Sequence, residues 1–87
     1  MTDTAAPTLK VTARSPFQLY FDGEAQVVSG INKVGKFDIL PGHASFFSVI
    51  NPDSEVTIGT DKEDTHIKVS NGIVTAKDDE VLLFLDI

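Results

Sequence analysis

The run Leu9-Lys10-Val11-Thr12-Ala13-Arg14 alternates apolar and polar side chains. After a break at Ser15-Pro16, the run Phe17-Gln18-Leu19-Tyr20-Phe21-Asp22 alternates in the same way. Successive side chains of a strand point to opposite faces, whereas those of a helix return to one face every 3.6 residues. The two runs are therefore predicted to be half-buried strands.

The same period recurs along the rest of the chain, at Ala25 and Val27, Val56 and Ile58, Ile67 and Val69, and Ile73 to Ala76. No window keeps the apolar spacing of a helix. The longest ambiguous stretch, His43 to Ile50, is too short to change the class. The pattern predicts an all-β fold of about eight to ten short strands, arranged as a β-sandwich or a β-barrel.

Turn-forming residues separate these runs. The strongest signal is Asn71-Gly72, which predicts a two-residue type I′ hairpin with positive φ at both positions. The other predicted turns are Asp22-Gly23, Ser29-Gly30, Pro41-Gly42, Asn51-Pro52-Asp53, Gly59 to Asp64, and Asp78-Asp79.

Length and composition indicate one compact domain. The chain has 87 residues, 41% of them hydrophobic and 23% charged, which is ordinary for a globular protein. We assign residues 9–87 to this domain and residues 1–8 to a flexible N-terminal tail. Seven Lys and Arg against 13 Asp and Glu give a net charge of −6, which repels nucleic acid and anionic lipid. The absence of Cys excludes disulfides, thiolate metal sites and cysteine nucleophiles.

No export signal or membrane span is visible in the sequence. Residues 1–8 have neither a basic region nor an apolar run. No later stretch approaches the ~20 apolar residues of a spanning helix. We expect a soluble protein without direct membrane insertion.

Two places carry more apolar residues than a small sandwich can bury. Both faces of the run Val81-Leu82-Leu83-Phe84-Leu85 are apolar. Phe46 and Phe47 are adjacent, so in a strand one ring points into the core and the other points away from it. A two-layer sandwich buries only one face of each strand, so the surplus side chains are covered by loops of the same chain or by a protein partner.

No set of residues indicates catalysis, a cofactor or a metal. His43 stands beside a Pro-Gly turn and His66 lies on the polar side of its run, and the clustered ligands of a metal site are missing. We interpret His66 as a surface residue. No Ser lies in a nucleophile motif, and Gly30 to Gly35 lacks the Lys-Ser/Thr pair of a phosphate loop. This last stretch is interpreted as an irregular surface loop.

The acidic clusters Asp61-Lys62-Glu63-Asp64 and Asp78-Asp79-Glu80 fall at predicted turns. Their spacing differs from that of a calcium-binding EF-hand loop. Charged residues at a hairpin tip are usually solvated and hinder the pairing of strand edges between molecules. We therefore expect two exposed turns rather than cation sites.

The segment Gly35-Lys36-Phe37-Asp38-Ile39-Leu40-Pro41-Gly42-His43-Ala44 closely resembles a signature of the epsilon subunit of F-type ATP synthases, usually G-x-L-G-I-L-P-G-H-A. In the correct order, Val69-Ser70-Asn71-Gly72-Ile73-Val74 and then Asp79-Glu80-Val81-Leu82-Leu83 resemble the S-G-G, strand, turn and V-T-V-L ending of that family. Leu9-Lys10-Val11 and Phe21-Asp22-Gly23 fall where the family has its first hairpin. The resemblance covers residues 9–86.

The resemblance implies a non-catalytic subunit of the central stalk of a rotary ATP synthase. The matching region of this family is a two-sheet antiparallel β-sandwich. It packs against the gamma subunit and rests on the ring of c subunits, at the cytoplasmic face of the bacterial membrane. Two helices follow it, which can inhibit ATP hydrolysis and in some members bind ATP. Because this chain ends at Ile87, neither activity is expected of it. No cofactor is implied.

Matching positions imply the contact residues. The gamma-subunit contact falls on Leu40, His43, Phe46, Phe47 and Ser48. The c-ring contact falls on Asn32, Lys33, Val34, Gly35 and Lys36.

Three positions depart from the family pattern. Lys36 stands where members often have a carboxylate, which reverses the charge expected at the ring contact. Asp38 stands where Gly is common, and Asn71 stands where the first Gly of S-G-G is common. Asn tolerates positive φ, so the change at Asn71 is mild, whereas Asp is less permissive at position 38.

The residues alone leave two other functions open. One is a free-standing β-sandwich module that binds a peptide or a sugar through Phe46 and Phe47. The other is a small jelly-roll enzyme that uses His43 and His66. A stable complex with the gamma subunit argues against the first, and metal analysis of His43→Ala and His66→Ala tests the second.

Overall fold

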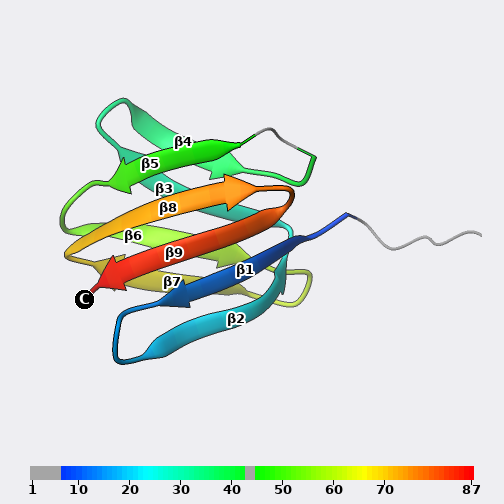
Figure 1. Cartoon of the computed structure of the whole chain (residues 1–87), viewed down its shortest axis with the longest axis horizontal. Coiled ribbons are helices and arrows are strands. Elements are labelled where there is room, and N and C mark those ends of the chain that lie inside the picture. Colours follow the sequence, from blue (N-terminus) through cyan, green and yellow to red (C-terminus); the bar gives the residue numbers. More distant parts are fainter. Residues whose placement is uncertain (1–6, 43–44) are drawn as a thin grey trace, which may run out of the picture.

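The computed structural model describes residues 7–42 and 45–87. Within these ranges nine strands form two sheets that pack face to face (Figure 1). One sheet has the strand order β2-β1-β9-β8-β5 and the other β4-β3-β6-β7. The predicted all-β, two-sheet sandwich is confirmed, and so is the predicted number of strands. The strands are β1 (Leu9–Arg14), β2 (Leu19–Ala25), β3 (Val27–Asn32), β4 (Gly35–Ile39), β5 (Phe46–Ile50), β6 (Ser54–Gly59), β7 (Asp64–Val69), β8 (Asn71–Lys77) and β9 (Glu80–Asp86).

One strand pair departs from the antiparallel arrangement that the sequence predicts. β1 and β9 lie parallel, with Val11 opposite Val81 and Ala13 opposite Leu83. The other neighbouring strands are antiparallel. Parallel neighbours are not joined by a tight turn, so turn signals carry no information about the pairing of the first strand with the last.

The core lies between the two sheets and is built from alternate residues of the strands. β1 buries three residues on one side and β9 buries three on the side that faces the same core. The predicted alternations of β6 and β7 are confirmed. Full burial of a large aliphatic side chain stabilises the fold by about 1.5–3 kcal/mol. The largest side chains that are almost fully buried are Leu9, Ile50, Ile58, Leu83, Val11, Val28, Val56, Val69, Val74 and Val81.

The start of β2 differs from the prediction. Phe17 lies outside the strand and is 96% exposed, and Leu19 is also exposed. The backbone N–H groups of Phe17 and Gln18 donate to Oγ of Ser15, which closes a turn over these residues. The register then shifts between Ala13 and Arg14. The apolar period of the second run is therefore broken before the strand begins.

Two predicted turns lie inside strands. Asp22-Gly23 belongs to β2 and Ser29-Gly30 belongs to β3. Gly30 lies opposite Phe37, and a Cβ atom there would be 2.7 Å from Phe37 Cζ. This glycine therefore makes room for an aromatic ring rather than for a turn. The break predicted at Ser15-Pro16 is confirmed, and so are the turns predicted at Pro41-Gly42, Asn51 to Asp53, Gly59 to Asp64, and Asp78-Asp79.

The strongest predicted hairpin, Asn71-Gly72, is wrong. Both residues are in β8, and neither has a positive φ. A Cβ atom at Gly72 would be 2.9 Å from Leu85 Cδ2 and 3.0 Å from the Phe84 carbonyl oxygen, so close packing requires the glycine. The type I′ geometry occurs instead at Asp78 and Asp79, whose φ angles are 53° and 62°.

Candidate functional site

Strand β5 separates its two adjacent phenylalanines. Phe46 packs against the core, and its ring centroid is 5.2 Å from that of Phe37 in the opposite sheet. Phe47 points outward and is 64% exposed. The Phe46 ring is therefore covered by residues of this chain, whereas no described residue covers the Phe47 ring.

The outer side of the five-stranded sheet carries an apolar face, which we define as Phe47, Val49, Ile73 and Phe84. Val49 lies opposite Ile73, and Ile73 lies opposite Phe84, so a row of three exposed apolar side chains crosses β5, β8 and β9. These strands lie side by side at the front of the molecule in Figure 1. The prediction that both faces of β9 are apolar is confirmed: Leu83 is fully buried on the inner face, and Phe84 is 44% exposed on the outer face.

A shallow groove of about 430 Å³ adjoins the apolar face at the end of the sandwich where β5 and β9 end. Pro16, Val49, Pro52, Ile73 and Phe84 are among its lining residues. A second groove of about 480 Å³ shares Val49 and Pro52 with the first and extends toward the turn between β3 and β4. The apolar face is therefore continuous with that turn.

The turn between β3 and β4 is a tight hairpin, not the irregular loop predicted for Gly30 to Gly35. We call residues 32–36 the tip. The side-chain Oδ1 of Asn32 accepts hydrogen bonds from the N–H groups of Val34, at 2.9 Å, and Gly35, at 3.2 Å. Gly35 has φ +134°, which favours glycine. These bonds leave the side chains of Lys33, Val34 and Lys36 exposed.

The predicted contact residues are distributed unevenly. Phe47 lies on the apolar face, but Ser48 points to the inner side of β5, where its Oγ accepts a 3.0 Å hydrogen bond from Nδ2 of Asn32. Leu40 is exposed at the end of β4 remote from the tip. His43 lies outside the described residues. Ser48 is thus brought to the tip, away from the side of the sheet on which Phe47 lies.

Three members of the apolar face were missed from the sequence as contact residues. Val49 alternates with Phe47 in one strand, and Phe84 belongs to the double-faced run, so both had a signal. Ile73 is joined to them only by its pairing with Val49 and Phe84. Cross-strand register is the information that assembles the face.

The outer side of the four-stranded sheet carries a polar face, which we define as Ser29, Asp38, Glu55, Thr57 and His66. Ser29 lies opposite both Asp38 and Thr57, and Thr57 lies opposite His66, so a polar row crosses the sheet. The backbone of Asp38 is ordinary strand without positive φ, and its carboxylate accepts a hydrogen bond from Oγ of Ser29.

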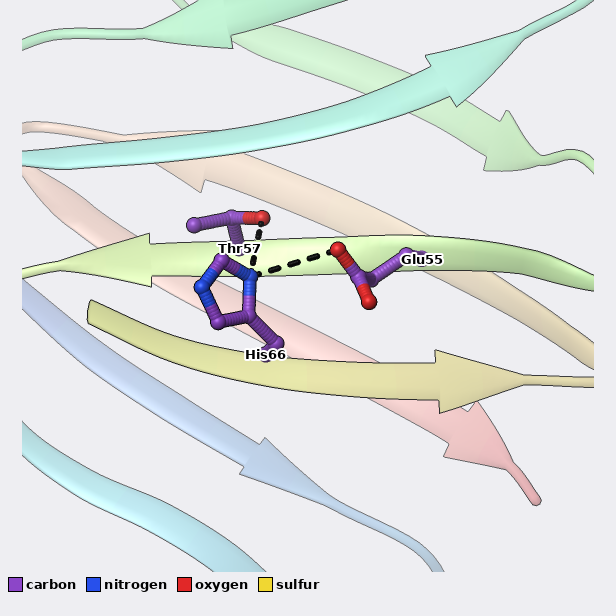
Figure 2. A network of polar contacts seen from close by, with 3 residues as sticks. All are labelled: Glu55, Thr57 and His66. Atoms are coloured by element: carbon purple, nitrogen blue, oxygen red, sulfur yellow. Dashed lines mark hydrogen bonds and ion pairs between the residues drawn. The ribbon is translucent and has the colours of Figure 1, made fainter.

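His66 is an exposed residue of the polar face, as predicted. Its Nδ1 lies 3.2 Å from Oε1 of Glu55 and 3.1 Å from Oγ1 of Thr57 (Figure 2). The side chains of His66 and Glu55 are both more than half exposed, so the contact contributes little to stability. In the part of the chain that the structure describes, no three His, Asp or Glu residues are grouped in a way that could hold a metal ion.

The two acidic turns are mainly solvated, as expected. Asp61, Glu63 and Asp64 are exposed at the turn between β6 and β7. Asp79 is half-buried, and its Oδ1 accepts a 2.9 Å hydrogen bond from the Gly42 N–H, which ties the turn after β4 to the turn between β8 and β9. Among residues 7–42 and 45–87 there is no helix that is long and apolar enough to cross a membrane.

This chain is similar in sequence to proteins named as ATP synthase epsilon chains. An ATP synthase epsilon chain of Clostridium novyi is 28% identical over 81 residues, which are 93% of this chain and 62% of that protein. An ATP synthase epsilon chain of Bordetella parapertussis is 32% identical over 79 residues, which are 91% of this chain and 56% of that protein. The chain thus spans about three fifths of the length of these relatives.

Solved structures share the fold. A chain of the Euglena gracilis mitochondrial ATP synthase, in a structure of OSCP, F1 and c-ring, has a TM-score of 0.82 at 12% identity, over 95% of this chain and 53% of that one. A chain of the Tetrahymena thermophila mitochondrial ATP synthase, in a structure of the central stalk and c-ring, has a TM-score of 0.75 at 17% identity, over 91% and 63%. At such identities the likeness concerns the fold.

The whole sandwich matches a known protein family. The family described as the ATP synthase, Delta/Epsilon chain, beta-sandwich domain matches residues 8–86. That range contains all nine strands of the structure, together with the apolar face and the tip. This chain therefore belongs to the family of the β-sandwich domain of the ATP synthase delta/epsilon chain.

Proposed function

We propose that this chain is a non-catalytic subunit of the central stalk of an F-type ATP synthase, in which it links the gamma subunit to the c ring. In this role it supports assembly of the complex and proton-coupled ATP synthesis at the cytoplasmic face of the bacterial membrane, without inserting into the bilayer. Residues 9–87 act as one domain. Membership of the family supports this role, and so do the relatives, which are named as epsilon chains.

The apolar face is the observation that carries the proposal. Four large apolar side chains lie exposed on neighbouring strands of one sheet, beside an apolar groove. A permanent interface of a multi-subunit complex is rich in such residues, because the partner removes them from water. We assign this face to the gamma subunit, with Phe47 as its anchor. Leu40, His43, Phe46 and Ser48 stay in the proposed contact on the strength of the resemblance.

The tip supplies the second contact, with the c ring, through Asn32, Lys33, Val34, Gly35 and Lys36. The side chains of Lys33, Val34 and Lys36 are exposed, and Val34 is 96% exposed. A stalk element that passes torque must resist bending. The two sheets are packed through a continuous core, and the hydrogen bond from Asn32 to Ser48 joins the tip to the opposite sheet. This is a stiff arrangement for two contacts on one body.

The test is a binding experiment with the purified gamma subunit of the same organism. We expect the two proteins to co-elute as a stable complex on size-exclusion chromatography, because burial of the apolar face stabilises the association. Circular dichroism of the same sample checks that the chain is folded. A folded chain that forms no complex would contradict the proposal and would favour a free-standing module that binds a peptide or a sugar.

A further inference from the structure

The tip differs in charge from the rest of the molecule. Residues 25–37 contain Lys33 and Lys36 but none of the 13 carboxylates of the chain. The net charge of −6 is therefore the sum of a segment of +2 and a remainder of −8. In an acidic protein this segment is suited to attract an anionic partner.

The other lysines lie beside carboxylates. Lys10 is opposite Glu24 and Glu80 on its two neighbouring strands, Lys77 is opposite Glu80, and Lys68 is opposite Glu55. Lys62 stands between Asp61 and Glu63. By contrast, Lys33 is in the turn and Lys36 is opposite Ile31. The carboxylate nearest to Lys36 along its strand belongs to Asp38, which accepts a hydrogen bond from Ser29.

The tip presents its charges on a fixed backbone. Oδ1 of Asn32 accepts hydrogen bonds from the N–H groups of Val34 and Gly35, and Nδ2 of Asn32 donates a hydrogen bond to Oγ of Ser48. The two lysines therefore flank an exposed Val34 in a conformation that exists before binding. A preorganised loop loses less conformational entropy when it binds. The hairpin is thus suited to a partner with one apolar recess between anionic groups.

We infer that the surface bound by the tip is acidic: a protein surface whose carboxylates meet Lys33 and Lys36 around an apolar recess for Val34. This inference rests on the proposed function, so it assigns carboxylates to the polar loops of the c ring that is the partner of this chain. An anionic lipid surface suits the molecule less. Each lysine contributes only about 1 kcal/mol at a membrane, and the remaining −8 charge repels lipid headgroups.

The experiment measures binding of the full chain to the detergent-solubilised c ring of the same organism, at increasing salt concentration. The double variant Lys33→Glu/Lys36→Glu reverses both charges and removes none of the groups that hydrogen-bond to Asn32, so we expect it to fold. Circular dichroism checks that it does. The matched control, Lys62→Glu/Lys68→Glu, makes the same change of net charge. Its residues lie in the turn between β6 and β7 and on β7, the edge strand of the sheet remote from β4.

We expect the tip variant to bind about tenfold more weakly or worse at low salt, while the control stays within about twofold of the native chain. Added salt should weaken binding of the native chain and strengthen binding of the tip variant, because it screens attraction in the first case and repulsion in the second. Val34→Ser should weaken binding about threefold with the native salt dependence. Unchanged or tighter binding of the tip variant, or equal loss in the control, would overturn the inference.

Two further outcomes separate this inference from the proposed function. If the native chain binds neither the ring nor the gamma subunit, the proposed function is wrong, and the inference is overturned with it. If the native chain binds vesicles of anionic phospholipid and the tip variant does not, the partner is lipid, and only the inference is overturned. Binding of the native chain to the ring without binding to such vesicles supports it.

Discussion

The two outer faces of the sandwich are opposite in character. The row Val49–Ile73–Phe84 crosses the five-stranded sheet with apolar side chains, whereas the row Asp38–Ser29–Thr57–His66 crosses the four-stranded sheet with polar ones. Both rows are built by the same rule, since each takes the outward residue of successive strands. What differs is the cost of their contact with water.

This difference supports the assignment of the proposed partner to the apolar face. Antiparallel sheets often have one polar face in water, and the polar face meets that description with its own hydrogen bonds. The apolar face has no such bonds to offer, and its exposed side chains lie together in one patch. A sandwich thus needs only one inner core to fold, and an apolar outer face is available for binding.

The largest expected effect is on the free energy of unfolding, and it tests whether the outward side chains of β9 contribute to the folded core. Leu83→Ala should lower the free energy of unfolding by about 3 kcal/mol, because Leu83 is fully buried and a cavity remains. Phe84→Ala, its neighbour on the apolar face, should lower it by about 1 kcal/mol or less. Urea denaturation measures both values. Equal losses would mean that Phe84 is part of the folded core.

A smaller effect compares the two faces in binding. Phe47→Asp should weaken binding to the gamma subunit by about 2 kcal/mol, because it places a charge in an apolar contact. Thr57→Asp places the same charge on the polar face and should leave the affinity unchanged. Calorimetric titration measures both, and urea denaturation confirms that each variant is folded. If Thr57→Asp is the weaker binder, the interface lies on the polar face instead.

The smallest effect concerns the network of the polar face. His66→Ala should change the free energy of unfolding by no more than about 0.5 kcal/mol, because the contact with Glu55 is exposed to solvent. A double-mutant cycle with Glu55→Ala should give a coupling energy of similarly small size. A coupling well above about 1 kcal/mol would show that this network contributes to the fold after all.

The candidate site was predictable only in part. Adjacent Phe46 and Phe47 must point to opposite sides of a strand, so one exposed ring follows from the sequence. Which of them is exposed depends on Phe37, a residue of the other sheet that covers Phe46. Likewise, the exposure of Lys33, Val34 and Lys36 follows from a hairpin held by Asn32, whose second bond reaches β5.

The turns show a limit of local signals. Glycine before or after a polar residue indicates a turn, yet Gly30 and Gly72 lie in strands because neighbouring side chains would collide with a Cβ atom there. The two positive φ angles of the type I′ hairpin occur at Asp78 and Asp79 instead. The sequence does not distinguish a glycine that is required because a Cβ atom would clash from a glycine that is required because the backbone has a positive φ angle.

The sequence by itself determined the class of fold, because the period-two spacing of apolar residues is a local property of a strand. Its motifs also carried the resemblance to the family that the chain was then shown to join. Only the tertiary structure decided the parallel pairing of β1 with β9 and the assembly of Phe47, Val49, Ile73 and Phe84 into one face. Both depend on register between strands that are distant along the chain, and no local pattern encodes that register.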